Sequence, residues 1–286
     1  MTHPLRFGIK TAPQHTTYDE ILRVWREADA VPAIEHAWLF DHYSPIHSDV
    51  DGPCLEGWQT LAALAAATER VRLGLMVTGN TYRHPAVLTK IAITTDVISG
   101  GRLDFGIGAG WNEYEHASMG IPLYAPGERI RRLDEACQIY KLLSTQHTTD
   151  FDGRYYTLKE ARSEPKPVQK PYAPITIGGS GEQLTLKVVA KHADIWNFAG
   201  GAPEMFTHKA NILRGHCETV GRNFDDIQKS VQLVVNPDDL EGTARTVQTY
   251  VDVGATHIIL NLRPPFPAGI VARLADEVIP RITPHS

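Results

Sequence analysis

The chain has 286 residues, with 28 lysines and arginines against 33 aspartates and glutamates, so its formal net charge is −5. This mild acidity excludes a general nucleic-acid binder, which needs a basic face, and a polybasic membrane anchor. Apolar residues make up 42% and charged residues 21% of the chain, a globular composition that excludes a disordered or collagen-like protein.

The cysteines, the N-terminal residues and the longest apolar run indicate in which part of the cell the protein is found. Cys54, Cys137 and Cys217 are far apart and form no CxxC or CxxH pair, which indicates free thiols in a reducing environment. Residues 1–14 contain no apolar stretch typical of a signal peptide. The longest apolar run, residues 61–67, is far shorter than the ~20 residues that a membrane span needs. We therefore expect a soluble, cytoplasmic protein without a membrane partner.

The N-terminal half of the chain alternates short apolar runs with helical patterns. Runs typical of buried strands occupy residues 5–11, 37–40, 71–77 and 103–107. Helices are predicted over residues 18–30, 58–68, 86–99 and 128–143. The third helix should end at Gly100 and Gly101, because glycine readily adopts the left-handed conformation of a helix cap.

The C-terminal half repeats this alternation. Strands are predicted over residues 174–177, 194–198, 230–235 and 257–261, and helices over 184–192, 202–220, 242–254 and 269–282. Strands that alternate with helices pair in parallel, because parallel neighbours need a crossover connection. Eight such units in roughly 280 residues favour a single (β/α)8 TIM barrel, spanning residues 1–286, over a doubly wound sheet.

The extra length of the chain lies in an excursion over roughly residues 112–173. It contains the predicted helix 128–143 and a possible hairpin over residues 151–158, where Asp152-Gly153 is typical of a turn. Residues 165–174 carry four prolines and predict an extended surface crossing. We expect these segments to lie over the C-terminal mouth of the barrel, where barrel enzymes carry their active sites.

Asp41 and His42 follow the second predicted strand, so a barrel would place them at this mouth. A histidine there can give or take a proton near neutral pH, and an acidic neighbour can orient it. A histidine that only bonds a loop carbonyl explains the pair equally well.

Two glycine-rich segments follow strands. Gly106, Gly108 and Gly110 have GxGxG spacing rather than the GxGxxG of a dinucleotide loop, so they favour a barrel loop that a planar cofactor can approach. The residues 178–181 (GGSG) follow a strand and lead into a helix expected to begin near Glu182. Backbone N–H groups at such a turn, together with the Ser180 hydroxyl, can hold a phosphate, although an ordinary glycine-rich turn would have the same sequence.

The sequence gives little support for a metal site or for covalent acyl transfer. The 13 histidines form no HExxH motif, so we predict no metal site, and no GxSxG motif indicates covalent acyl transfer. Aromatic residues lie near the predicted strand ends, where they pack the barrel or face a ring-shaped ligand. These residues are Tyr82, Trp111, Trp196 and Phe198.

Several sequence blocks together resemble the luciferase-like family of flavin and deazaflavin oxidoreductases. The N-terminal blocks are WLFDHY (38–43), LAALAAATERVRLG (61–74) and the long stretch from YRHPAVL to MGIP (82–122). RLDEACQIYKLL (132–143), FDGRYYTL (151–158) and PKPVQKPYAPITIGGSGE (165–182) continue the similarity, which weakens in the last third. The subgroup most similar to this chain is the actinobacterial one regarded as coenzyme F420-dependent.

This resemblance implies a (β/α)8 barrel whose mouth binds the tricyclic ring of the cofactor. It implies that Asp41 and His42 stand beside the redox face, and that the Met76–Val77 bond is a cis peptide supporting the ring from behind. It further implies that Gly106, Gly108, Gly110 and Asn112 line the ribityl chain. The phosphate would be bound by the turn formed by Gly178, Gly179, Ser180 and Gly181, in agreement with the interpretation of this glycine-rich segment as a possible phosphate site.

One position departs from the family's sugar-phosphate dehydrogenases. They carry a glutamate just after the fourth-strand glycines, whereas this chain has Trp111 there and Glu113 two residues later. An aromatic wall made by Trp111, Tyr82 and Trp196 suggests a less polar organic substrate than glucose 6-phosphate.

The sequence therefore predicts an F420-dependent hydride transferase acting on a small molecule with an activated C=C, C=N, carbonyl or alcohol group. His42 would serve as proton donor or hydrogen-bond donor to substrate, with Asp41 orienting the site. An FMN-dependent monooxygenase of the same fold is the alternative, and a non-catalytic cofactor-binding protein is a third. An apolar face on helix 58–68 or 86–99, with the resemblance, suggests a homodimer.

Overall fold

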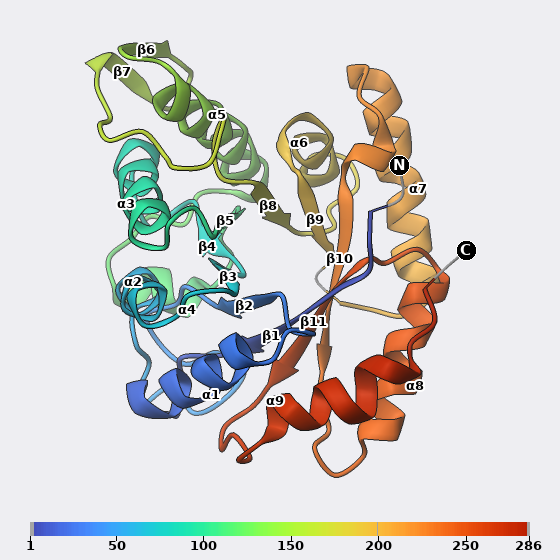
Figure 1. Cartoon of the computed structure of the whole chain (residues 1–286). Helices are drawn as coiled ribbons and strands as arrows, with labels where there is room; N and C mark the ends of the chain where they lie inside the picture. Colours follow the sequence, from blue (N-terminus) through green and yellow to red (C-terminus); the bar gives the residue numbers. More distant parts are fainter. Residues whose placement is uncertain (1–2, 199, 285–286) are drawn as a thin grey trace.

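The computed structural model describes residues 3–198 and 200–284, and parallel strands within them close into a barrel (Figure 1). In order around the barrel, its eight strands are β1 (Arg6–Thr11), β2 (His36–Leu39), β3 (Arg72–Leu75), β5 (Leu103–Gly108), β8 (Ile175–Gly178), β9 (Ile195–Phe198), β10 (Gln228–Val234) and β11 (His257–Leu262). The barrel closes because β11 pairs with β1 in parallel, from Arg6 opposite His257 to Thr11 opposite Leu262. The predicted (β/α)8 fold is confirmed.

Helices follow the strands and cover the outside of the barrel. They are α1 (Tyr18–Ala30), α2 (Gly57–Ala67), α3 (Pro85–Ile98), α4 (Glu113–Ser118), α5 (Pro126–Thr145), α6 (Thr185–His192), α7 (Pro203–Val220), α8 (Leu240–Asp252) and α9 (Ile270–Arg273). The predicted end of α3 is confirmed, since Gly100 and Gly101 have φ values of +66° and +90°. The last predicted helix is shorter than expected: after α9 the chain continues as a π-helical turn, Leu274–Val278, and a 3-10 turn, Ile279–Arg281.

The inside of the barrel has an apolar middle and polar layers. Trp38, Met76 and Ile259 pack together there, with Val77 against them. Below this cluster, the rings of His36 and His257 stack with centroids 3.9 Å apart. The apolar cluster therefore separates a buried histidine layer from the strand ends, where the barrel opens.

The excursion over residues 112–173 departs from the prediction that it lies over the mouth. The predicted hairpin exists, as β6 (Thr149–Asp152) and β7 (Thr157–Ala161), but Figure 1 shows it on the outside, against α5. Glu135 of α5 accepts hydrogen bonds from backbone N–H groups of residues 154–156 at the hairpin turn. From this excursion, α4 brings Glu115 against His42 at the mouth.

The proline-rich crossing lies at the opposite end of the barrel from the one predicted. Its residue Gln169 donates a hydrogen bond to the Leu103 carbonyl at the start of β5 and contacts Arg72 at the start of β3. The reason is geometric: α5 runs away from the mouth, and the chain must then enter β8 at the end where strands begin.

Two further sequence expectations concern single features. Cys54, Cys137 and Cys217 are free cysteines, as predicted. In the part of the chain that the structure describes, no helix has the length and apolar character needed to cross a bilayer.

Candidate active site

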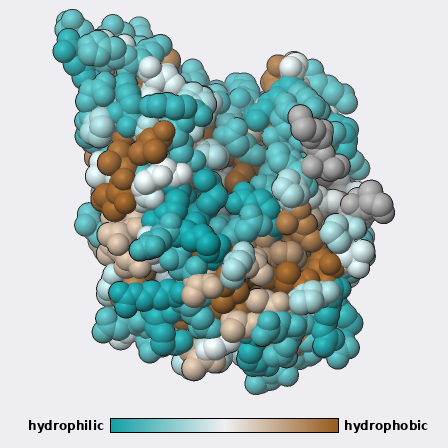
Figure 2. Space-filling model, viewed as in Figure 1, coloured by the Kyte–Doolittle hydropathy of each residue, from teal (hydrophilic) through white to brown (hydrophobic). Residues whose placement is uncertain are grey.

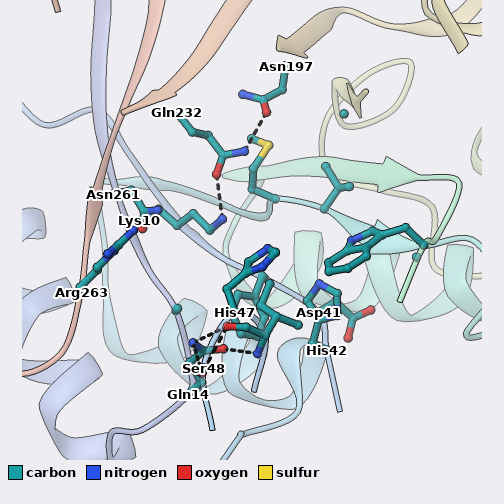
Figure 3. Close-up of a pocket in the computed structure, with 18 of the residues that line it drawn as sticks. Lys10, Gln14, Asp41, His42, His47, Ser48, Asn197, Gln232, Asn261 and Arg263 are labelled. Atoms are coloured by element: carbon teal, nitrogen blue, oxygen red, sulfur yellow. Dashed lines mark hydrogen bonds between the residues drawn. The ribbon is translucent and has the colours of Figure 1, made fainter. Parts of the chain in front are cut away.

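A cavity of about 950 Å³ opens at the carboxyl ends of the barrel strands (Figure 3). The predicted site residues that border it are Asp41, His42, Met76, Val77, Tyr82, Gly110, Trp111, Gly178 and Gly179. The structure therefore brings together residues from five separate parts of the sequence. The predicted residues that do not border it are Gly106, Gly108, Asn112, Ser180, Gly181 and Trp196.

His42 faces this cavity with one of its two ring nitrogens already engaged. Its Nδ1 lies 2.8 Å from Oε2 of Glu115, a carboxylate on α4 that is completely buried. A carboxylate at this nitrogen fixes the orientation of the ring. Nε2 has no hydrogen-bond partner among the described residues, so it is the nitrogen that can exchange a proton with a ligand.

Glu115 is held in its charged form by several donors. The Tyr82 hydroxyl and the Tyr43 backbone N–H donate to its two oxygens, and the Ser44 N–H lies 3.3 Å away. Burial opposes the charge of Glu115, but the hydrogen bonds from His42, Tyr82 and Tyr43 outweigh it and hold its pKa below the ordinary value. The same carboxylate and burial raise the pKa of Tyr82, so this phenol stays protonated.

Asp41 has a different role from the one predicted. Its carboxylate is fully buried and forms a two-armed ion pair with Arg83, with N–O distances of 2.5 and 3.1 Å. Thr78 donates a further hydrogen bond to it, and Arg83 also pairs with Glu56. Asp41 therefore anchors the start of this loop, and Glu115 takes the place expected for Asp41 as the carboxylate that orients His42.

The floor of the cavity is the connection between β3 and β4 (Thr78–Gly79). The Met76–Val77 bond there is cis, as the resemblance implied. A Cβ on Gly106 would lie 1.8 Å from the Leu75 carbonyl oxygen, and one on Gly108 would lie 2.7 Å from the Val77 side chain. These two glycines therefore make room for the Met76–Val77 segment instead of lining the cavity as predicted.

The loop after β5 gives the cavity its aromatic side. Trp111 is 51% exposed, stacks on His47 with ring centroids 5.6 Å apart and meets the His42 ring edge-on. Gly110, with a φ of +78°, turns the chain into this position. Asn112 does not line the cavity, because its side chain caps α4 by accepting from the Glu115 N–H.

Trp196 is not part of this aromatic side. It is completely buried, stacks on Phe206 and donates from its indole N–H to the Gly179 carbonyl at 2.8 Å. Phe198 is buried beside it. Trp196 faces the helices because β9 alternates its side chains, and Asn197 is the residue that points into the barrel.

The glycine turn after β8 has the properties of an anion cradle. Gly179 has a φ of +135°, and the N–H groups of Ser180, Gly181 and Glu182 have no hydrogen-bond acceptor among the described residues. The Ser180 hydroxyl is also buried without a partner. The helix α6 begins at Thr185 rather than near Glu182, since residues 182–184 form a turn. This set of unpaired donors matches the oxygens of a phosphate.

The residues of the site that were missed in the sequence include Lys10, Arg83 and Glu115. A signal existed for Glu115, because Asn112-x-x-Glu115 is a capping pattern that starts a helix directly after the glycine loop. Lys10 and Arg83 gave no local signal, since their importance comes from strands and loops far away in the chain. No three His, Cys, Asp or Glu side chains within the described ranges are grouped so as to hold a metal ion.

Known proteins resemble this chain in sequence and in fold. It is 32% identical over 240 residues to a protein of Microbacterium testaceum (strain StLB037) named F420-dependent glucose-6-phosphate dehydrogenase, covering 82% of this chain and 69% of that protein. An F420-dependent secondary alcohol dehydrogenase, solved with an F420-acetone adduct, superposes with a TM-score of 0.88 at 17% identity over 98% of this chain and 100% of the other.

A second solved structure has the same fold. The coenzyme F420-dependent tetrahydromethanopterin reductase of Methanopyrus kandleri gives a TM-score of 0.82 at 16% identity, covering 98% of this chain and 100% of the other. Residues 3–262 match the luciferase-like monooxygenase family. Because this match covers most of its length, the chain belongs to the luciferase-like monooxygenase family.

Proposed function

We propose that this protein is a coenzyme F420-dependent oxidoreductase that transfers hydride between the deazaflavin and a small organic substrate. The observation that carries the proposal is that Gly178 and Gly179, which begin the glycine turn, border the same cavity as His42, so that a phosphate-bearing cofactor and a proton donor can meet there. The F420-dependent relatives in sequence and fold support this choice of cofactor.

The residues present fit such a cofactor. The unpaired N–H groups and hydroxyl of the Gly178–Gly181 turn would hold its phosphate, and Met76 and Val77 would support its ring. When bound, the deazaflavin supplies the carbon that gives up or accepts the hydride.

The chain's own residues would manage the proton and the surroundings. His42, held at Nδ1 by Glu115, would give a proton from Nε2 to the substrate oxygen, nitrogen or carbon, or accept one in the reverse direction. Glu115 and Tyr82 would position that ring, and the aromatic side formed by Trp111 and His47 would exclude water.

The substrate remains proposed by class: an activated C=C, C=N, carbonyl or alcohol. Trp111 occupies the position where sugar-phosphate dehydrogenases have a glutamate, and Glu113 is exposed and does not border the cavity. A carboxylate nevertheless reaches His42, from Glu115. The aromatic side of the cavity is what argues for a substrate less polar than glucose 6-phosphate.

An FMN-dependent monooxygenase is the second candidate, since the family includes monooxygenases by name. Equilibrium binding of F420 and of FMN to the purified protein, side by side, separates the two. We expect low-micromolar or tighter binding of F420 and much weaker binding of FMN. Preference for FMN would move the protein to the oxygen-using branch, and binding of neither would overturn the cofactor assignment.

A pair of matched variants tests the cradle in the same experiment. Ser180→Asp places a negative charge at the proposed phosphate position, whereas Ser180→Asn has a similar size and no charge. We expect the aspartate variant to bind F420 at least about tenfold more weakly than the asparagine variant. Equal affinity in the two variants would remove residues 178–181 from phosphate binding.

We further propose a cytoplasmic homodimer. The sequence predicts an apolar face on helix 58–68 or 86–99, now α2 and α3, as the surface that would form the dimer. Of these two helices only α3 exposes large apolar side chains: Val87, Val97 and Ile98 are 55%, 41% and 45% exposed. Figure 2 shows a brown patch on the side where Figure 1 places α3. Light scattering of the unaltered protein should give a mass twice that of the 31.7 kDa chain. For the Val87→Lys variant, the measured mass should fall toward that of a single chain.

A further inference from the structure

The side of the cavity opposite His42 is built from a lysine and amides, which we call the amide wall: Lys10, Asn197, Gln232 and Asn261. These residues come from β1, β9, β10 and β11, and all four border the cavity (Figure 3). Nothing in the roles described above uses them.

A directed chain of hydrogen bonds links three residues of this wall. Lys10 Nζ donates to Gln232 Oε1 at 2.7 Å, and Gln232 Nε2 donates to Asn197 Oδ1 at 2.8 Å. Asn197 Nδ2 in turn donates to the Ser230 hydroxyl at 2.9 Å, deep in the barrel. In this chain Gln232 and Asn197 each turn the amide oxygen toward the preceding donor, so that Lys10 donates to the oxygen of Gln232.

Lys10 is left with binding capacity directed at the cavity. An ammonium group has three donors, and within the described ranges only the bond to Gln232 uses one. No carboxylate there lies within ion-pair distance, and burial lowers the pKa of Lys10 to about 8, without an acidic neighbour to oppose this. A buried cation without a paired anion raises the free energy of the folded protein, so an anionic ligand beside Lys10 would stabilise this wall.

We propose that Lys10, together with the amide of Asn261, is a subsite for the carboxylate of the organic substrate. The proposal rests on the function proposed above and adds a substrate class to it. The buried ammonium of Lys10 matches a carboxylate, the second cation that borders the cavity, Arg263, is exposed, and a phosphate dianion already has its own cradle at residues 178–181. The apolar part of such a substrate would pack against Trp111 and His47, whose rings form the aromatic side of the same cavity.

The test measures binding rather than turnover. Benzoate and cinnamate, each beside its neutral amide, are titrated into the F420-loaded protein and into the protein alone, with cofactor fluorescence and melting temperature as readouts. We expect the carboxylates to bind at least about tenfold more tightly than the amides. Equal affinity for acid and amide, or no binding of either acid at millimolar concentration, would overturn the subsite.

Matched variants assign the effect to Lys10. Lys10→Met should weaken carboxylate binding at least about tenfold and leave amide and F420 affinities within about twofold. Lys159→Met, an exposed lysine on the hairpin, should change nothing. Because Lys10→Met removes a desolvated charge, its melting temperature should not fall below that of the unaltered protein, which shows that the variant folds.

Two sources of a carboxylate give different results. If Lys10→Met weakens F420 binding and leaves the probe acids unaffected, the anion belongs to the cofactor and the substrate subsite is wrong. If the unaltered protein fails to bind F420 at all but its melting temperature still rises with benzoate and not benzamide, the subsite stands and the proposed cofactor fails.

Discussion

The two sides of the cavity satisfy their charges in opposite ways. On the side of β2 and α4, which we call the acidic wall, His42, Glu115, Asp41 and Arg83 are joined in pairs, so every carboxylate there has a hydrogen-bonded cation or ring. The amide wall opposite offers one lysine and no carboxylate. A wall whose charged groups are already paired can hold them in a fixed geometry for catalysis, whereas a wall with an unpaired cation is stabilised when an anionic ligand binds.

The pairing on the acidic wall also ties separate elements of the fold together. Glu115 joins α4 to the backbone after His42, and Arg83 joins the loop after β4 to the end of β2. The amide wall is held by strand pairing, with Lys10 in register with Asn261 on β11, and by hydrogen bonds among its own side chains. Substitutions on the two walls should therefore separate catalysis and stability from ligand affinity.

The largest effect is expected from His42→Ala. Removing the proton-exchanging ring should lower turnover by about 10²- to 10⁴-fold, while the Kd for F420 stays nearly constant, because the phosphate cradle lies elsewhere in the cavity. Turnover would be followed by deazaflavin absorbance with any alcohol, enone or imine on which the unaltered protein is active. A variant with normal rates would remove His42 from the chemistry and leave the acidic wall a structural device.

The next effect is one of stability. Arg83→Met leaves Asp41 buried without its cation, which should lower the free energy of unfolding by about 3–5 kcal/mol in urea denaturation. Lys191→Met breaks the more exposed pair with Asp134 and serves as the control, with an expected loss of about 1 kcal/mol or less. Similar losses in both variants would show that Asp41 does not depend on Arg83.

The sequence predicts the parts of this site that depend on local pattern. The barrel strands, the glycine turn after β8 and the position of His42 at a strand end follow from alternation and spacing. Trp196 was misplaced because its direction depends on strand register, and Asn112 because its pattern with Glu115 was not recognised as a helix cap. The partners Glu115 of His42, 73 residues away, and Gln232 of Lys10, 222 residues away, depend on barrel closure, which no local pattern encodes.

The smallest expected effect, a pH dependence, tests whether the acidic wall is held by charge. The pKa of Glu115 is lowered in the folded protein, so its stabilising contribution is complete above the ordinary value of 4.5 and is lost as the pH falls through the lower, folded value. Glu115→Gln, which keeps the shape, should therefore be less stable by about 1–2 kcal/mol at neutral pH. The melting temperatures of the two proteins should stay apart from neutral pH down to the ordinary value of 4.5 and converge as the pH falls further below it. A difference in melting temperature that stays constant over the whole pH range would mean that Glu115 acts through packing. The acidic wall would then not be held by charge pairing, and it would no longer contrast in this respect with the amide wall.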